Sequence, residues 1–178
     1  MLAECGAVVI DADAISRQMT GPGGAAIAAI AGEFGAPFIT SDGALNRDMM
    51  RELVFGDPAA RLRLEAIVHP RVRKETQRQT LQARTRCIVF DVPLLVESGR
   101  WRQALDQVLV VDCSPAIQIS RVMARNGWTE KVVLQVMAGQ ASREQRLAAA
   151  DACISNGQAV TLVALAGQVR QLAGRFGL

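Results

Sequence analysis

Residues 87–92 read CIVFDV, a continuous apolar run that reaches an acid at its end. Two other stretches have the same form: AVVIDA at residues 7–12 and QVLVVDC at residues 107–113. Continuous apolar runs, as opposed to alternating ones, are typical of strands buried on both faces, as in a parallel sheet covered by helices. We therefore predict three such strands, and residues 152–155 as a short last one.

The segments between these runs carry helix signals. Asp57-Pro58 and Ser114-Pro115 each place a capping residue before a proline at the first helical position. Pro70 lies inside the second expected helix, and we expect it to kink or break that helix. Strands that alternate with helices predict an α/β fold with three layers. The expected helices cover residues 23–34, 57–82, 115–125, 129–139, 142–150 and 158–175.

Bulk properties exclude several classes of protein. The 178 residues fit one domain, or one domain with an inserted subdomain. The chain has a net charge of +3, five Phe, two Trp and no Tyr. It therefore lacks the interleaved basic and aromatic residues of a nucleic-acid groove, and we expect no nucleic-acid partner. The sequence has no apolar run long enough for a membrane span and no signal-peptide pattern. Four Cys without metal or redox spacing indicate a reducing, cytoplasmic location and no metal-ligand set.

Acidic residues stand at the carboxyl ends of the predicted strands. They are Asp11 and Asp13 after the first run, Asp91 in the second and Asp112 in the third. Ligands of open α/β sheets bind beyond the carboxyl ends of the strands. These acids therefore outline one candidate site.

Short motifs then occur in a characteristic order along the chain. They are V-I-D-A-D-x-x-x-R at residues 9–17, S-D-G at 41–43 followed by Leu45 and Arg47, H-P at 69–70, D-V-P-L-L-V-E at 91–97, V-V-D at 110–112, R-x-x-x-R at 121–125, Q-A-S-R at 140–143 and I-S-N-G at 154–157. Together they resemble the dephospho-CoA kinases, P-loop kinases of the nucleoside-monophosphate kinase type. The resemblance covers nearly the whole chain, and D-A-D, H-P and V-P-L-L-V-E in this order are its most specific part.

This resemblance implies a three-layer, parallel-sheet P-loop kinase fold. It implies phosphoryl transfer from ATP to the ribose 3′-hydroxyl of dephospho-CoA, the final step of coenzyme A biosynthesis. Residues 36–84 would form a helical insertion that binds the acceptor, and residues 121–143 would form a short lid. Mg²⁺ is expected because phosphoryl transfer uses it, not because the sequence shows ligands for it.

One element of the family is missing. The family begins with a strand and a G-x-x-x-x-G-K-[ST] loop, whereas residues 1–6 resemble the end of the helix that follows, and the motif occurs nowhere in the chain. We interpret residues 1–178 as a single kinase domain without its first strand and P-loop, and we favour a miscalled or shortened start over a true loss.

The missing segment affects binding and folding. Each lost charge-assisted hydrogen bond to phosphate costs about 1.5–3 kcal/mol. The buried side chains of such a strand contribute about 6–12 kcal/mol, which is comparable to a whole domain's stability of about 5–15 kcal/mol. We expect the 178-residue chain to be marginally stable or unfolded alone, and its activity stays open.

Asp13 is the candidate general base, because an ionised Asp can orient the acceptor hydroxyl and take its proton. The alternative is that Asp13 caps a helix that begins near Ala14. Asp11 is the weaker candidate because it points to the opposite face if the strand persists. Arg17 would share a helix face with Asp13, either to bind acceptor phosphate or to form a salt bridge with Asp13.

Further acceptor residues are implied by the resemblance. His69 matches the H-P element of the acceptor region, and the alternative is a hydrogen-bonded His beside a helix break. Pro93, Leu94 and Leu95, with Glu97, would line the acceptor site, although the leucine pair can also be core.

Arginines and one turn are the candidates on the ATP side. Arg121 and Arg125 share a helix face, and their planar guanidinium groups suit phosphate oxygens. We assign Arg121 to catalysis and Arg125 to the lid; a solvated helix face is the alternative. Arg143 matches a family position near the phosphates, or pairs on a surface helix. Asn156-Gly157 resembles the loop beside adenine, although the pair is also an ordinary turn.

Two rival functions stay open. The first is a kinase of the same scaffold with another small acceptor, since one scaffold supports many acceptors. The second is a non-catalytic, truncated homologue that binds a CoA-like ligand. The sequence does not fix the oligomeric state.

Overall fold

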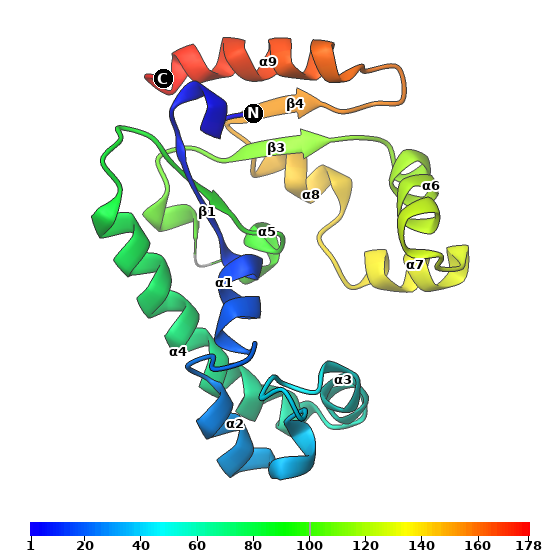
Figure 1. Cartoon of the computed structure of the whole chain (residues 1–178). Coiled ribbons are helices and arrows are strands. Elements are labelled where there is room, and N and C mark those ends of the chain that lie inside the picture. The colour runs from blue at the N-terminus through cyan, green and yellow to red at the C-terminus, as the bar shows by residue number, and fades with distance from the viewer. Residues whose placement is uncertain (100) are drawn as a thin grey trace. The chain divides into compact units, whose positions relative to one another are not determined.

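The computed structural model describes residues 1–99 and 101–178 (Figure 1). It contains two compact units. One consists of Ala7–Val92, and the other of Pro93–Leu178 together with Met1–Gly6. They are called the 7–92 unit and the 93–178 unit below.

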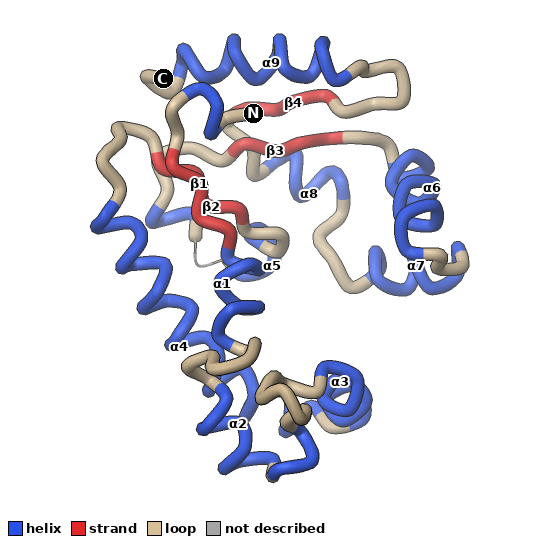
Figure 2. Tube along the Cα trace, in the orientation of Figure 1, coloured by secondary structure: helices blue, strands red, loops and turns tan. Residues whose placement is uncertain are grey.

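The 7–92 unit combines one pair of strands with four α-helices. Its elements are β1 Val8–Asp11, α1 Ala12–Met19, α2 Ile27–Phe34, the 3-10 turn η2 Ala36–Phe38, α3 Arg47–Gly56, α4 Pro58–Gln82 and β2 Ile88–Asp91. Strands β1 and β2 pair in parallel, with Val8 opposite Ile88 and Asp11 opposite Asp91. Both strands (red in Figure 2) therefore end in a carboxylate at the same edge of the ladder.

A single apolar cluster holds this unit together. Ile10 on β1 and Ile30 on α2 are 1% and 0% exposed. The other buried members come from α1, α3, α4 and the loops between them: Ile15, Met19, Ala26, Leu45, Met50 and Val68. Because β1 and α1 both contribute buried side chains, the junction between them is fixed in position.

Helix α4 runs without interruption from Pro58 to Gln82, so the predicted break at Pro70 is wrong, whereas the kink stays a prediction. Asp57 caps the helix, its side chain accepting a hydrogen bond from the Ala59 N–H at 2.8 Å. A proline inside a helix removes one backbone donor, but α4 also packs against α1, α2 and α3. The Arg71 guanidinium adds hydrogen bonds to the carbonyl oxygens of Ile67 and Ala25, at 2.6 and 2.9 Å. These contacts outweigh the lost hydrogen bond.

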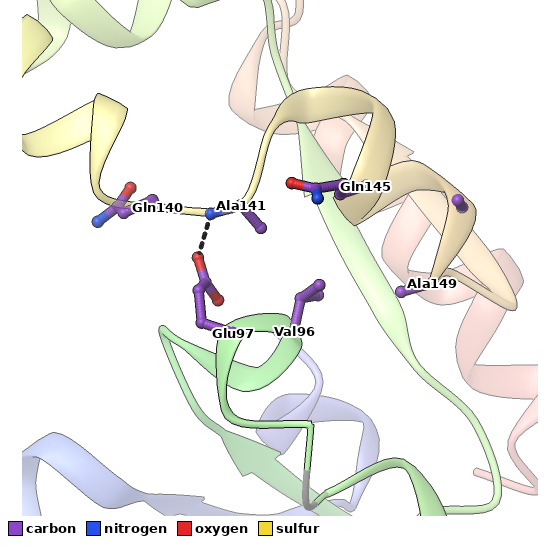
Figure 3. Close-up of a pocket in the computed structure, with 7 residues that line it drawn as sticks. Val96, Glu97, Gln140, Ala141, Gln145 and Ala149 are labelled. Carbon is purple, nitrogen blue, oxygen red and sulfur yellow. Dashed lines mark hydrogen bonds between the residues drawn. The ribbon is translucent and has the colours of Figure 1, made fainter.

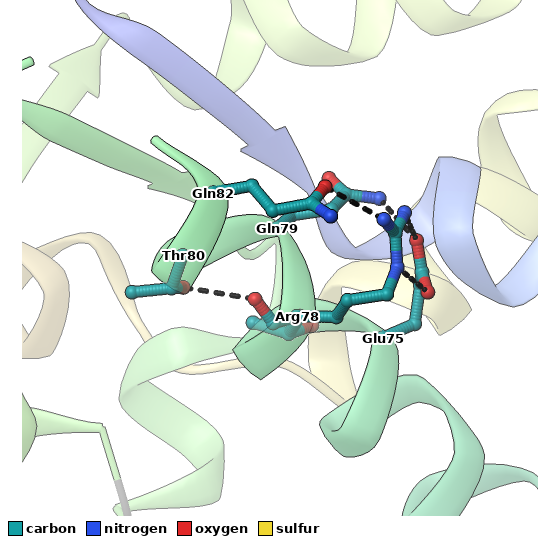
Figure 4. A network of polar contacts seen from close by, with 6 residues as sticks. Glu75, Arg78, Gln79, Thr80 and Gln82 are labelled. Atoms are coloured by element: carbon teal, nitrogen blue, oxygen red, sulfur yellow. Dashed lines mark hydrogen bonds and ion pairs between the residues drawn. The ribbon is translucent and has the colours of Figure 1, made fainter. Parts of the chain in front are cut away.

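The last turns of α4 carry a network of polar side chains (Figure 4). Arg78 binds both oxygens of Glu75, at 2.6 and 2.7 Å, and also the Gln82 side chain at 2.7 Å. Gln79 donates a further hydrogen bond to Glu75 at 2.9 Å. The hydrogen bonds from Arg78 and Gln79 lower the pKa of Glu75 to about 2.

The 93–178 unit contains the second pair of strands. Its elements are η1 Ala3–Cys5, α5 Leu95–Ser98, η3 Arg102–Ala104, β3 Leu109–Asp112, α6 Pro115–Asn126, α7 Glu130–Ala138, α8 Arg143–Ala148, β4 Ala152–Ser155 and α9 Leu162–Arg175. Strands β3 and β4 are parallel, with Asp112 opposite Ser155. Helix α8 contacts β3, and α9 lies along β4 (Figure 1).

Local sequence explains where these helices begin and end. Gly127, at φ 68°, ends α6 in the left-handed conformation that glycine adopts freely. Ser142 opens α8 with a capping box, in which Gln145 bonds back to the Ser142 N–H. Thr161 caps α9 through the Ala164 N–H at 3.2 Å. This cap explains why α9 begins at Leu162 instead of residue 158.

The parallel α/β prediction is confirmed, and all four strands lie where the sequence indicated. Helix α2 begins later than expected because residues 21–24 form a turn, in which Gly24 donates to the Gly21 carbonyl at 2.9 Å. No helix in the described part of the chain has the length and apolarity that a bilayer crossing requires.

Candidate functional site

The junction of β1 and α1 separates the roles of Asp11 and Asp13. The Asp11 side chain accepts a hydrogen bond from the Ala14 N–H at 2.8 Å and so caps α1. Asp13 lies in the first helical turn, is exposed, and has no hydrogen bond or ion pair with any described residue. The alternative that Asp13 is the cap is therefore wrong, because the strand ends at Asp11 and the helix begins two residues earlier than expected. Asp13 keeps a free carboxylate.

Arg17 pairs with Asp11, with Nη2 3.5 Å from Oδ2, and not with Asp13 as one interpretation of the sequence expected. The pair follows from the capping geometry, which turns the Asp11 carboxylate onto the first turns of α1. Asp91, the register partner of Asp11, is exposed and is also without a bonding partner among the described residues.

His69 lies on α4 and is exposed. It has no hydrogen bond or ion pair within the described residues. The alternative of a hydrogen-bonded His beside a helix break is wrong, because His69 has no hydrogen bond within the described residues and the helix is unbroken. Its contact with a substrate stays a prediction.

The segment after β2 borders an open hollow of about 710 Å³ (Figure 3). Val96 and Glu97 on α5 line one side, and the other side is lined by Gln140, Ala141, Gln145, Ala148 and Ala149. Glu97 accepts a hydrogen bond from the Ala141 N–H at 2.7 Å, and Arg146 donates to the Ala141 carbonyl at 2.5 Å. Glu97 therefore holds the chain immediately before α8.

The other residues of this segment do not line the hollow. Pro93 and Leu94 are exposed, and Leu95 is half-buried. The alternative that the leucine pair is core thus does not hold for Leu94, which is 49% exposed.

Arg121 reaches the loop that follows β4. Its Nη1 and Nη2 atoms donate to the carbonyl oxygens of Asn156 and Gly157, at 3.0 and 3.4 Å. The structure thus brings together three residues that the sequence singled out separately. Arg121 has no carboxylate partner among the described residues, so its charge is uncompensated there.

Arg143 forms a two-point pair with Asp112 at the end of β3. Its Nε and Nη2 atoms donate to the two carboxylate oxygens at 2.9 and 2.6 Å. These hydrogen bonds lower the pKa of Asp112 and raise the pKa of Arg143. Because one edge of the guanidinium is used, the Nη1 group stays available for an anion. Arg125 instead bonds its own neighbour, with Nε 2.9 Å from the Asn126 Oδ1 atom.

Comparison with known proteins assigns this fold to a family. A profile described as dephospho-CoA kinase matches residues 1–161. A protein of Albidiferax ferrireducens named dephospho-CoA kinase is 60% identical over 181 residues, covering 100% of this chain and 85% of its own length. The chain belongs to the dephospho-CoA kinase family. A second relative of that name, from Burkholderia pseudomallei, is 49% identical and covers 99% of this chain and 86% of its own length.

Solved structures share the fold of this chain. The Thermus thermophilus protein TT1252 superposes with a TM-score of 0.79 and 26% identity, over 98% of this chain and 87% of its own. A dephospho-CoA kinase from Campylobacter jejuni gives a TM-score of 0.68 at 21% identity, over 97% and 86%, and supports the fold. The predicted P-loop kinase fold and kinase class are therefore confirmed, and ATP is the cosubstrate of this family. The boundaries at residues 36–84 and 121–143 stay predictions.

The side chains that could bind a metal ion are few in this family member. Among the described residues, no group of three or more His, Cys, Asp or Glu side chains could hold a metal ion. In kinase sites Mg²⁺ takes one or two carboxylates and otherwise binds substrate phosphates. This donor set fits an ion that is held mainly by the phosphates of the nucleotide.

Sequence reasoning missed several contacts in this dephospho-CoA kinase homologue. Gln168 on α9 binds both main-chain groups of Ser155, at 3.0 and 3.1 Å. Asp112 was seen only as a strand-end acid, and Arg146 not at all. These residues lie 5 to 31 positions from their partners, and the motifs that contain Asp112 and Ser155 do not indicate these contacts.

Proposed function

We propose that this chain transfers the γ-phosphoryl group of ATP to the ribose 3′-hydroxyl of dephospho-CoA, the last step of coenzyme A biosynthesis. Membership of the family and the names of its relatives support the reaction. The observation that carries the proposal is the free, exposed carboxylate of Asp13 in the first turn of α1, two residues after β1 ends. We place the reaction in the cytoplasm, where ATP is available, and the four free cysteines fit a reducing compartment.

Asp13 is the proposed general base. In a loose phosphoryl-transfer transition state the acceptor oxygen keeps its proton until late, so the base mainly orients the hydroxyl and then takes the proton. Asp11 is occupied by the helix cap and by Arg17. Asp13 has no such partner, so it can accept a hydrogen bond from the substrate without breaking one.

The proposed phosphate ligands are Arg121, Arg125 and Arg143. Charge spreads over the oxygens of the transferring group, and guanidinium donors stabilise it without moving during the reaction. Arg143 is held by Asp112 on one edge, which leaves Nη1 for a phosphate oxygen. Closure of residues 121–143 as a lid would exclude water. Asn156 and Gly157 would receive the adenine.

The proposed acceptor side uses Arg17 and His69, with Pro93, Leu94, Leu95 and Glu97. The exposed His69 has no hydrogen-bond partner among the described residues, so it can donate to a substrate phosphate or hydroxyl. The exposed Leu94 offers apolar surface for the uncharged part of the acceptor. Mg²⁺, bound through the ATP phosphates, would neutralise charge on the transferring group.

The test is acceptor-dependent ADP formation. It uses the 178-residue chain and the same chain extended at its N-terminus by a strand and a G-x-x-x-x-G-K-[ST] loop. Turnover with dephospho-CoA and not with nucleoside monophosphates supports the proposal. Asp13→Asn should lower the rate of ADP formation by a factor of about 10²–10⁴. Asp91→Asn changes the other free carboxylate near the carboxyl ends of β1 and β2, and it should leave most of that rate.

A non-catalytic homologue predicts a different result. The 178-residue chain would then show thermal stabilisation by dephospho-CoA and none by ATP, and the extended chain would form no ADP. Turnover with another small acceptor in place of dephospho-CoA would make the chain a kinase of the same scaffold with a different substrate.

A further inference from the structure

The loop after β4 is held by side chains to an unusual degree. The Gln168 amide accepts from the Ser155 N–H at 3.0 Å and donates to the Ser155 carbonyl at 3.1 Å. It thereby pairs with Ser155 as a neighbouring peptide group would. Helix α9 thus binds the last residue of β4 through a side chain, at the point where the chain leaves the strand.

The next two residues of the loop are fixed from other elements. The Asn156 N–H donates to the Asp112 carbonyl at the end of β3, at 2.7 Å. The carbonyl oxygens of Asn156 and Gly157 accept from Arg121 on α6. Five main-chain groups of Ser155–Gly157 are therefore bound by β3, α6 and α9 together.

Two groups of this loop are left over. Among the described residues, neither the side-chain amide of Asn156 nor the N–H of Gly157 has a hydrogen-bond partner. Asn156 is half-buried, so its amide is accessible to a ligand. An Asn amide pairs at two points with adenine, accepting from N6–H and donating to N7. Guanine presents acceptors at both positions, so its O6 would oppose the amide oxygen.

We propose that Gln168 is a positioning residue which, together with Arg121, holds the Ser155–Gly157 loop so that Asn156 selects adenine over guanine. This inference rests on the proposed function, since it concerns the nucleotide of that reaction. Gln168 lies beyond residues 1–161, so the family match does not assign it a role. Arg121 acts here through the loop, while its charge stays available for phosphate.

The test measures binding of adenosine and guanosine to the full chain by saturation-transfer NMR. Nucleosides carry no phosphate, so the measurement reports on the base alone. Wild type should bind adenosine at least about tenfold more tightly than guanosine, the ratio expected for one or two hydrogen bonds. Gln168→Leu, similar in size but without the amide, should narrow that ratio about fivefold. Gln171→Leu on the same helix, at an exposed residue that makes no described contact, should leave it unchanged.

If Gln168→Leu fails to fold, a second variant still tests the inference. Asn156→Asp preserves the main-chain bonds of the loop and replaces the amide donor with an acceptor. The carboxylate can accept from guanine N1–H and N2–H but cannot donate to adenine N7, so the preference should shift towards guanosine.

Several results would overturn the inference. Wild type without a preference for adenosine would do so, as would Gln168→Leu with a lower melting temperature but an unchanged ratio, since that pattern shows a structural role only. An unchanged preference in Asn156→Asp would do the same. If the nucleoside preference is present but no ADP forms with dephospho-CoA, the proposed function fails and the inference stands.

Discussion

The two units are stabilised in different ways. In the 7–92 unit, eight buried residues form one continuous apolar cluster, with side chains from β1, α1–α4 and the loops between them. In the described part of the 93–178 unit the buried hydrophobic residues are smaller in number and size: Val108, Val133, Ile154, Val169 and Ala173. Its loops are instead tied by side chains that bind distant main-chain groups, such as Glu97 to Ala141 and Gln168 to Ser155.

This difference bears on function. A buried Ile contributes about 1.5–3 kcal/mol through apolar burial, whereas one intramolecular hydrogen bond contributes about 0.5–1.5 kcal/mol net. The unit that carries the proposed nucleotide loop therefore depends on several weak, directional contacts. Such hydrogen bonds can fix the geometry of a loop that is not packed on a large apolar core. They can also be lost one at a time.

The largest effect is expected in the apolar cluster. Ile30→Ala should lower the free energy of unfolding by about 2–5 kcal/mol, because the side chain is fully buried and its removal leaves a cavity. Chemical denaturation followed by circular dichroism measures this. Leu62→Ala, at a side chain on α4 that is 66% exposed, should change stability by less than about 0.5 kcal/mol. Equal effects of the two substitutions would contradict the account of the core.

A smaller effect is expected when a polar contact of the 93–178 unit is broken. Asp151 accepts from the Val108 N–H at 2.8 Å and from Arg102 at 3.0 Å. Asp151→Ala leaves the N–H of a buried residue without its acceptor, so we expect a loss of about 1–3 kcal/mol. Asp106→Ala, an exposed acid without described contacts, is the matched control. A neutral Asp151→Ala in the same denaturation assay would show that the contact does not stabilise the unit.

The capping box of α8 should contribute less still. Ser142→Ala removes the acceptor for the Gln145 N–H, at 3.2 Å, and should cost about 1 kcal/mol. Ser142→Asn keeps a good cap and should be close to neutral. Hydrogen exchange of the first amides of α8 measures the local change; equal protection in both variants would argue against the cap.

The smallest effect is expected from the ion pair between Arg78 and the half-buried Glu75, and it depends on pH. Hydrogen bonds from Arg78 and Gln79 lower the pKa of Glu75 to about 2, from an ordinary value of 4.5. A carboxyl with a lowered folded pKa stabilises the fold above its unfolded pKa, and that contribution is lost as pH falls from about 4.5 towards 2. Glu75→Gln should therefore flatten the acid limb of the stability profile. Melting temperatures at pH 7 and pH 3 test this, and an unchanged slope would refute the linkage.

Asp112 provides the counterpart in the 93–178 unit. Arg143 lowers its pKa, so its pair is also present at neutral pH and weakens as pH falls below the ordinary range of Asp. Asp112→Asn should reduce the loss of stability of the 93–178 unit as pH falls. The loss of stability that comes from the Glu75 network in the 7–92 unit should not change.

The strands and most of the helices could be predicted from the sequence because continuous apolar runs and cap-proline pairs are local signals. Helix α3 (Arg47–Gly56), which has no cap-proline pair, was not expected. The break at Pro70 was wrongly predicted because tertiary packing of α4 outweighed a local rule. Asp11 and not Asp13 caps α1 because the helix begins two residues earlier than expected, and sequence patterns do not resolve helix boundaries that closely. The bond from Gln168 to Ser155 spans 13 residues, and nothing in either segment indicates it.

The central claim is that Asp13 is the base of a dephospho-CoA kinase, and one measurement tests it most directly. The rate of ADP formation with ATP and dephospho-CoA is compared for the chain joined to the Gly-rich loop segment and for its Asp13→Asn variant, at equal thermal stability. The account predicts acceptor-dependent turnover that falls by at least about 10² in the variant. Equal rates in the two proteins would contradict the role of Asp13, and turnover that does not depend on dephospho-CoA would contradict the function itself.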